Sequence, residues 1–167
     1  YASEKRSDEA EATLLKGREM APLDLASSML LASLYEVKGR VEEAIKVYEQ
    51  QLVQTPDVLV IVNNLASLLT DHHGNDADSM TRAQALARRL EAVDVPQFKD
   101  TVGWIAYLKG DYRTALVNLQ VAKDKLPEVA VVRYHFGMAL AAVKRSDDAK
   151  AELEKANSLV GPNDPIG

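Results

Sequence analysis

The densest group of side chains capable of chemistry lies in the segment TDHHGNDAD, residues 70–78, called the polar segment below. Its two histidines and three aspartates could bind a divalent metal ion, because imidazole nitrogens and carboxylate oxygens are common metal ligands. Zinc sites, however, need three or four ligands at suitable spacing, and the adjacent His72 and His73 point in different directions unless the backbone bends sharply. Gly, Asn and Asp also form turns without any ligand. We therefore predict a polar turn with no metal and no cofactor, and keep a weak divalent-ion contact as the alternative.

No other part of the sequence has residues arranged for catalysis. Cysteine is absent, which excludes thiolate nucleophiles, thiolate metal ligands and disulfides. The third histidine, His135, falls on an expected helix with no nucleophile paired to it, and an uncharged groove or core position is the common role for such a residue. The glycines do not form a phosphate-binding pattern. We expect a protein that is not an enzyme.

Composition excludes two further classes of partner. The chain has 167 residues, of which 47% are hydrophobic and 27% charged, and its formal net charge of −5 is unlike that of proteins that bind phosphate backbones. Its longest aliphatic run, residues 58–62, is too short to cross a bilayer. We expect no nucleic acid partner and no direct membrane insertion. Because the sequence opens on Tyr1 with neither an initiator Met nor a signal-peptide pattern, we also expect a fragment or processed form of a longer protein.

Small residues recur at a nearly constant interval along the chain. The interval from Ala10 to Ala44 equals that from Ala115 to Ala149, and at about 34 residues it matches the length of one helix-turn-helix repeat. A second series keeps the same interval in its first and last steps, and its members are Ala32, Ala66, Gly103 and Gly137. The middle step of this series is slightly longer and contains the polar segment. The sequence is therefore a repeat array with one insertion.

The residues around these small positions resemble the tetratricopeptide repeat family. The expected second helices have Ala, then a large residue four positions later and Pro eight positions after that, as in Ala44, Tyr48 and Pro56. The expected first helices have a large residue followed directly by a small one, and another large residue three positions after the small one. The resemblance implies an all-α fold, a right-handed α-solenoid of helix-turn-helix repeats, in which small residues let paired helices approach closely. The chain departs from the family at the fourth motif position, where Trp is common and this sequence has Ser28, Val62, Lys99 and Arg133.

In this register the chain is expected to form a single domain over residues 1–167. Its expected parts are a partial repeat (1–24), four repeats (25–58, 59–95, 96–129 and 130–160) and a tail (161–167). The expected helices lie near 7–20, 24–37, 41–54, 58–70, 78–93, 97–108, 112–125, 129–142 and 146–159, with N-caps at Asp57, at Asp78 or Ser79, and at Ser146. Turns fall at Gly39 and Gly110, and the polar segment falls in the turn of the unit that carries an insertion.

First helices line the concave groove of tetratricopeptide proteins, where peptides or helices of partner proteins bind. The resemblance therefore implies a non-catalytic protein-protein interaction scaffold. Its expected groove-facing residues are Met29, Ser33 and Glu36; Asn63, Asn64 and Ser67; Asp100, Thr101, Trp104 and Tyr107; and Tyr134, His135 and Met138.

Trp104 is the strongest candidate in this set, because tryptophan is enriched at binding hot spots. Its alternative role is packing against the neighbouring repeat. Asn63 and Asn64 could bind the backbone amides of a ligand, or they could cap local backbone instead. The carboxylate grip of chaperone-binding family members is not expected, because the matching positions Met29, Ser33, Gln97 and Thr101 carry no cation and only Asn64 agrees.

A narrower resemblance concerns the setting of the protein. Segments 63–69, 100–112 and 134–140 are similar to bacterial tetratricopeptide proteins associated with exopolysaccharide export and surface-protein sorting. This resemblance implies a periplasmic or outer-membrane-attached scaffold in preference to a cytoplasmic one. The alternative is an accessory domain of a larger enzyme, such as a glycosyltransferase or a polysaccharide-synthesis machine. Both ends of the array lack a polar cap, so we expect them to pair either with another copy, giving a homo-oligomer, or with further repeats.

Overall fold

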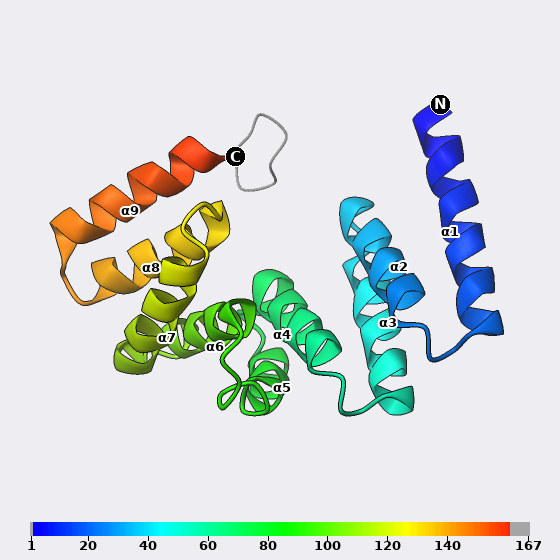
Figure 1. Cartoon of the computed structure of the whole chain (residues 1–167), viewed down its shortest axis with the longest axis horizontal. Helices are drawn as coiled ribbons and strands as arrows, with labels where there is room; N and C mark the ends of the chain where they lie inside the picture. Colours follow the sequence, from blue (N-terminus) through cyan, green and yellow to red (C-terminus); the bar gives the residue numbers. More distant parts are fainter. Residues whose placement is uncertain (1, 161–167) are drawn as a thin grey trace. The chain divides into compact units, whose positions relative to one another are not determined.

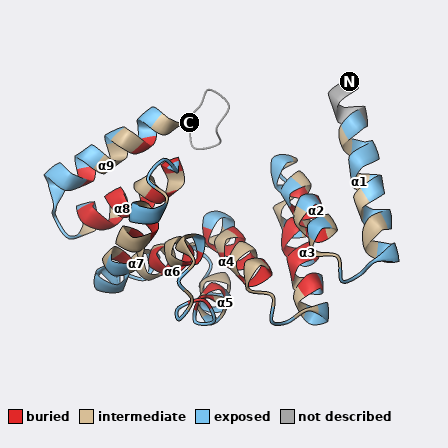
Figure 2. Ribbon diagram, in the orientation of Figure 1, coloured by how far each residue is buried: buried red, intermediate tan, exposed pale blue. Residues whose placement is uncertain are grey.

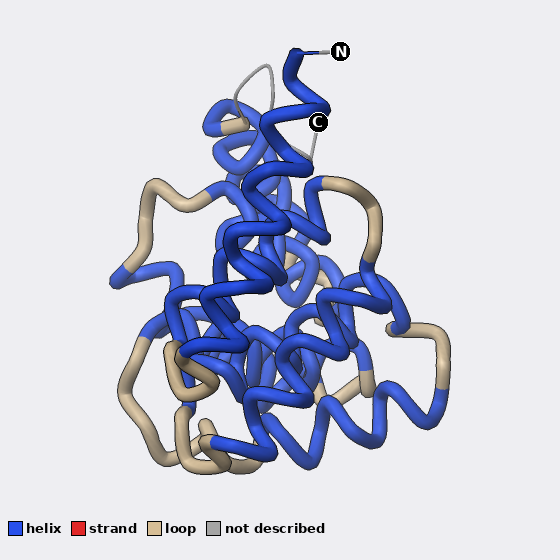
Figure 3. Tube along the Cα trace, turned by 90° about the vertical axis from the view of Figure 1, so that its right-hand side faces the viewer, coloured by secondary structure: helices blue, strands red, loops and turns tan. Residues whose placement is uncertain are grey.

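The computed structural model describes the backbone of residues 2–160 and the side chains of residues 6–160. Within this range the chain forms nine α-helices and no strand (Figure 1, Figure 3). The prediction of an all-α helical repeat is confirmed. The expected tail, residues 161–167, lies outside the described residues. The helices are α1 (Ala2–Met20), α2 (Leu25–Val37), α3 (Val41–Gln54), α4 (Leu59–His73), α5 (Ala77–Ala87), α6 (Pro96–Leu108), α7 (Tyr112–Lys125), α8 (Ala130–Ala142) and α9 (Ser146–Leu159).

The chain divides into two compact units, Tyr1–Ala83 and Gln84–Gly167. In the first unit α2 packs against both α1 and α3, and α3 packs against α4. In the second unit α7 packs against α6 and α8, and α8 packs against α9. The buried residues lie on the helix faces that meet these neighbours, and exposed residues occupy the opposite faces (Figure 2). Each packed pair is therefore an amphipathic hairpin or a contact between successive hairpins.

Small residues on first helices permit the close approach that the repeat pattern predicts. A Cβ atom added to Gly103 on α6 would lie 2.6 Å from Leu119 Cγ and 3.1 Å from the Leu119 backbone nitrogen on α7. A Cβ atom added to Gly137 on α8 would lie 2.9 Å from two side-chain carbons of Leu153 on α9. Real Cβ atoms do not approach so closely, so both hairpins need glycine at these points.

Three hairpin turns share one backbone geometry. Gly39 and Gly110 have φ values of 69° and 81°, in the left-handed region that favours glycine. Lys144 occupies the equivalent place between α8 and α9 with a φ of 63°. In each turn the next residue donates its backbone N–H to a carbonyl near the end of the first helix: Arg40 to Tyr35, Asp111 to Ala106 and Arg145 to Leu140. The sequence predicts the two glycine turns but gives no sign of the third.

A buried polar chain occupies the place where many repeats of this type have tryptophan. Ser28 on α2 is fully buried and donates its hydroxyl to Gln51 Oε1 on α3 at 2.6 Å. Gln51 Nε2 donates to Thr55 Oγ1, and Arg18 Nε on α1 donates to Ser28 Oγ at 3.1 Å. Hydrogen bonding of these buried groups removes the cost of their desolvation. These hydrogen bonds therefore satisfy the polar side chain that Ser28 brings to the fourth motif position in place of tryptophan.

Several expected element boundaries are wrong. Helix α1 begins at Ala2 rather than near residue 7, because no Pro or Gly interrupts its first two turns. Helix α5 ends at Ala87 rather than near residue 93, and short-range backbone bonds from Arg89 to Leu86 and from Leu90 to Ala87 close a tight turn that buries Leu90.

The expected N-caps are also wrong. The caps with side-chain hydrogen bonds belong to Asp24, Asp76 and Asp111, which accept from the backbone N–H of Ser27, Ser79 and Thr114. Helix α4 instead follows Val58, and α9 follows Arg145, in both cases with no side-chain cap bond. Each observed N-cap lies one or two residues from the nearest expected one, because the preceding turn ends at a different residue than the sequence suggests.

Candidate functional site

The polar segment is only partly a turn. Its first four residues, 70–73, extend α4 by a further helical turn, and the turn itself follows at Gly74. His73 Nε2 lies 2.8 Å from Glu42 Oε1 on α3, and Asp76 caps α5. Within the part of the chain whose side chains are described, no three His, Asp or Glu side chains are grouped so that they could hold a metal ion. The insertion is thus accommodated by helix extension and capping.

The extension of α4 places one residue of the polar segment in a pocket of the first unit. The pocket has a volume of about 330 Å³ and lies between α2 and α4, with one residue from α3. It is lined by Met29, Ser33, Glu36, Tyr48, Asn64, Ser67, Leu68 and Asp71. We call it the α2–α4 pocket. Asn64, Ser67, Leu68 and Asp71 lie three or four residues apart along α4 and therefore share one helix face.

Six of the eight residues that line the α2–α4 pocket carry a polar group in the side chain. Asn64 Nδ2 donates to the Tyr48 hydroxyl at 3.4 Å, and its Oδ1 accepts from Asn63 Nδ2 at 3.4 Å. Burial raises the pKa of the Tyr48 hydroxyl, so this group stays protonated at neutral pH. Desolvation likewise raises the pKa of Glu36, although Glu36 is an exposed residue. The nearby His72 opposes this rise, and the negative charge of Asp71 adds to it. The pocket therefore combines hydroxyl and amide groups with acidic side chains.

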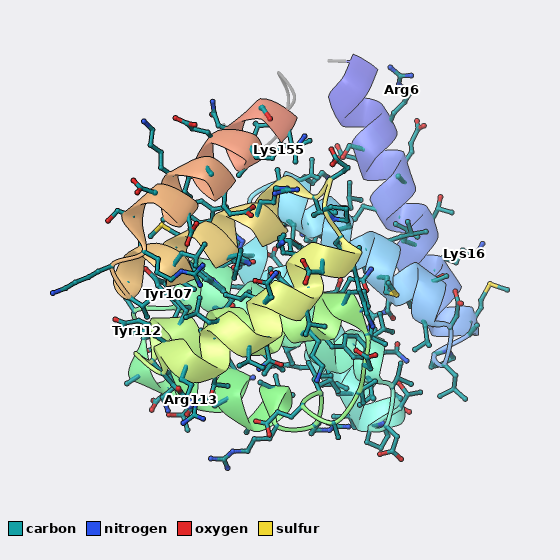
Figure 4. All side chains as sticks on the ribbon, turned by 60° about the vertical axis from the view of Figure 1, so that its left-hand side comes forward. Arg6, Lys16, Tyr107, Tyr112, Arg113 and Lys155 are labelled. Carbon is teal, nitrogen blue, oxygen red and sulfur yellow. The ribbon has the colours of Figure 1, made fainter. Side chains whose placement is uncertain are left out.

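The second unit carries a cluster of aromatic rings, called the Trp104 cluster. The indole of Trp104 is stacked on Tyr107 of the same helix, with ring centroids 4.8 Å apart. Its stack with His135 of α8 has a centroid distance of 4.1 Å and an interplanar angle of 15°. Tyr134 lies tilted to the indole with ring centroids 6.0 Å apart, and Tyr112 lies tilted to Tyr107 with centroids 5.8 Å apart. Tyr107 and Tyr112 are labelled in Figure 4. Stacked and tilted rings of this kind attract one another beyond their area of contact.

An acidic residue orients the histidine of this cluster. Asp100 on α6 has both carboxylate oxygens within 3.1 Å of His135 Nδ1, and the two side chains are 13% and 9% exposed. A carboxylate at this distance fixes the imidazole with Nδ1 as the donor. The Asp100–His135 contact therefore holds the imidazole flat against Trp104 and ties α6 to α8.

The structure places the expected groove residues in two groups. Ser33, Glu36, Asn64 and Ser67, with Met29, line the α2–α4 pocket, and Asn63 lies beside Asn64 without lining it. Asp100, Trp104, Tyr107, Tyr134 and His135 form the Trp104 cluster, and Met138 lies half-buried one helical turn beyond Tyr134.

Two of the expected groove residues are buried. Thr101 and His135 are only 5% and 7% exposed, because α6 and its neighbours cover them. Their side chains can position exposed neighbours, but they present little surface of their own to a partner. Trp104 is half-buried, so it takes part in packing between repeats and keeps an exposed edge.

Sequence reasoning missed three contributors. Tyr48 comes from a second helix, where a large residue reads as core. Asp71 was assigned to a turn, although its spacing from Ser67 continues the polar face of α4. Tyr112 is 39% exposed at the start of α7 and extends the Trp104 cluster.

Comparisons with known proteins support the repeat assignment. Residues 25–53, which contain most of α2 and α3, match the model of the tetratricopeptide repeat family. A thermophilic tetratricopeptide protein from Thermus thermophilus has a similar structure, with a TM-score of 0.72, 18% identity, and coverage of 97% of this chain and 87% of that chain. No curated protein matches the sequence significantly.

Two further solved structures share the fold. YrrB, described as a tetratricopeptide protein with an unusual peptide-binding site, has a TM-score of 0.63 at 18% identity, over 99% of this chain and 82% of its own. MamA has a TM-score of 0.62 at 18% identity, over 95% of this chain and 91% of its own. The fold is therefore that of tetratricopeptide proteins. In the described range no helix is both long and apolar enough to cross a membrane.

Proposed function

We propose that the protein is a non-catalytic scaffold that binds a peptide or helix of a partner protein along its first helices. The observation that carries this proposal is the α2–α4 pocket, where four polar residues among the expected groove residues, Ser33, Glu36, Asn64 and Ser67, gather around one cavity. Their side chains are polar and lie at a cavity, so packing of the core does not explain their types. The peptide-binding site for which YrrB is named supports the same role for this fold.

The Trp104 cluster of the second unit is a separate candidate binding surface. Both faces of the indole are covered by Tyr107 and His135, so a ligand meets ring edges and tyrosine hydroxyls rather than an open platform. Tyrosine and tryptophan contribute much to binding because they present a large area with few rotatable bonds. A peptide with apolar and hydrogen-bonding groups suits such a surface.

Panning a random-peptide display library on the whole chain tests the proposal. We expect selected peptides to bind the wild-type protein and to lose about tenfold or more in affinity for Asn64→Ala or Trp104→Phe. The second substitution keeps an aromatic ring in the stack. Exposed Glu19→Gln on α1 is the control. Peptides that bind all variants equally would move the binding site to another face.

The setting of this scaffold is a separate proposal. We place it in a bacterial envelope or polysaccharide-export assembly, periplasmic or attached to the outer membrane, on the resemblance of its first-helix segments to proteins of that kind. The alternative is an accessory domain of a larger polysaccharide-synthesis enzyme. Fractionation of the source cell, followed by detection with an antibody against this chain, distinguishes a periplasmic from a cytoplasmic location.

Self-association is proposed on an observation in the first unit. An open groove of about 660 Å³ between α1 and α2 has a largely apolar lining that includes Leu14, Leu30 and Val37. Leu30 and Val37 are 60% and 84% exposed, which is unusual for large apolar side chains in a soluble repeat. Sedimentation equilibrium tests this: a mass that rises with concentration and falls in Leu30→Ser supports pairing, whereas a constant monomer mass contradicts it.

A further inference from the structure

The side chain of Glu36 lines the α2–α4 pocket without a partner among the described residues. Within the described residues its carboxylate makes no hydrogen bond and no ion pair, although it stands at the α2–α4 pocket. Two other glutamates of the unit, by contrast, have cationic partners: Glu11 meets Lys38 and Arg40 at 2.9 Å and 2.8 Å, and Glu43 meets Arg40 at 2.9 Å. Glu36 thus places a carboxylate at the pocket that makes no ion pair with any described Lys or Arg of the fold.

The rest of the α2–α4 pocket is suited to a positive group. None of its lining residues is Lys or Arg, and Asp71 adds a second carboxylate from α4. Ser33 and Ser67 bring hydroxyl oxygens, which can accept hydrogen bonds from an ammonium or guanidinium group. Met29 and Leu68 add apolar atoms to the lining, and these suit the hydrocarbon stem of a long cationic side chain.

We propose that the α2–α4 pocket takes a Lys or Arg side chain of the bound partner peptide. The cation pairs with Glu36, and its stem packs on the apolar part of the lining. This inference rests on the proposed function and names the chemistry that the partner brings to it. A cavity of about 330 Å³ is large enough for one such side chain and too small for a whole helix.

The electrostatics of the pocket agree with this assignment. Desolvation disfavours the charged form of Glu36 and raises its pKa, so an incoming cation would stabilise the carboxylate and lower that pKa again. The titratable groups around Glu36 are Asp71 and His72 of α4 and Tyr48 of α3. The negative charge of Asp71 strengthens the attraction for a cation. Cation binding is therefore expected to weaken as the solution becomes acidic, because Glu36 loses its negative charge.

Small probes test the inference without knowledge of the natural partner. The probes are Nα-acetyl-lysine amide, Nα-acetyl-arginine amide and the uncharged Nα-acetyl-norleucine amide, each titrated into the ¹⁵N-labelled whole chain by NMR. We expect the two cationic probes to shift the Asn64 side-chain amide and the backbone amides of Ser33 and Ser67. Norleucine amide, which has the stem without the charge, is expected to shift them much less.

Matched variants assign the effect to one carboxylate. Glu36→Gln removes the charge with almost no change of shape, and we expect it to weaken lysine-amide binding about tenfold or more. Glu19→Gln makes the same change of net charge on α1 and is expected to leave binding unchanged. Equal shifts with norleucine amide, or equal binding by Glu36→Gln and wild type, would overturn the inference.

The failure of this inference is distinguishable from the failure of the proposed function. If selected peptides bind the first helices but Glu36→Gln changes neither them nor the lysine probe, the scaffold role stands and the cation site is wrong. If lysine amide binds through Glu36 but no peptide is selected, the cation site stands and the scaffold role is contradicted.

Discussion

The imidazole of His135 stacks on the indole of Trp104, with ring centroids 4.1 Å apart, and this contact joins two consecutive first helices. Asp100 fixes the imidazole at 3.0 Å through Nδ1. Three residues at expected binding positions therefore also hold α6 and α8 together. Substitutions at His135 or Asp100 are expected to act first on the stability of the second unit and only through it on binding.

His135→Ala is predicted to destabilise the second unit by about 2 kcal/mol, because it leaves a gap against Trp104 and deprives the partly buried Asp100 of its partner. Trp104 is the only tryptophan of the chain, so its fluorescence during urea denaturation reports this unit. The exposed His72→Ala serves as control. An unchanged denaturation midpoint in His135→Ala would contradict a structural role for the stack.

Gly103→Ala is predicted to destabilise the hairpin of α6 and α7 by about 1–3 kcal/mol, since the new methyl group would meet Leu119 at 2.6 Å. A double-mutant cycle with Leu119→Ala identifies the cause. If the close approach to Leu119 is responsible, adding Gly103→Ala to the Leu119→Ala protein costs much less than adding it to wild type. Strict additivity of the two changes would show that the contact is not the reason for glycine here.

Lys144→Gly is predicted to stabilise the protein by about 1 kcal/mol, because Lys144 has a φ of 63° that glycine adopts without strain. Thermal denaturation of the variant measures the gain. Lys109→Gly is the matched control, since Lys109 has a φ of −89° beside the equivalent turn and gains nothing from glycine. A lower melting temperature for Lys144→Gly would show that its side chain makes a compensating contact.

Two glutamate substitutions are predicted to have opposite effects on stability at neutral pH. The pKa of Glu36 is raised by desolvation, so its charge opposes folding above that pKa, and Glu36→Gln should stabilise the protein at pH 7. The pKa of Glu11 is lowered, chiefly by its hydrogen bond with Lys38, so its charge favours folding and Glu11→Gln should destabilise it.

Both differences are expected to fade on acidification. The Glu36 effect disappears below the ordinary pKa of glutamate, where the carboxyl is protonated in the folded and unfolded states alike. The Glu11 effect persists to lower pH and is lost as the pH falls through its depressed folded-state pKa. Urea denaturation at a series of pH values checks both trends, and effects of the same sign at pH 7 would contradict the assignment.

Much of the fold follows from the spacing of a few residues. Gly103 and Gly137 meet leucines of the partner helix as their period implies, and Gly39 and Gly110 form the turns expected of them. The third turn was not predictable, because Lys144 has no intrinsic preference for positive φ and adopts it under the constraint of the hairpin. Tertiary packing likewise decides the length of α5, which stops where Leu90 becomes buried.

The candidate site was predictable in outline only. Helical register brings Ser33, Glu36, Asn64 and Ser67 to one surface, and the structure places all four at the α2–α4 pocket. Helical register does not predict side-chain rotamers or contacts between neighbouring repeats. The burial of His135 and the stacking of Trp104 with Tyr107 and His135 could therefore not be predicted from the sequence. Asp71 was missed because Gly, Asn and Asp nearby favour a turn, whereas the helix continues through His73.

The most direct measurement is an NMR map of the whole chain saturated with a peptide selected from the display library. Binding along the first helices predicts chemical-shift changes concentrated on α2 and α4 around Asn64, or on α6 and α8 around the indole N–H of Trp104. Changes confined to α3, α5, α7 and α9, with Asn64 and Trp104 unaffected, would contradict the proposed binding surface.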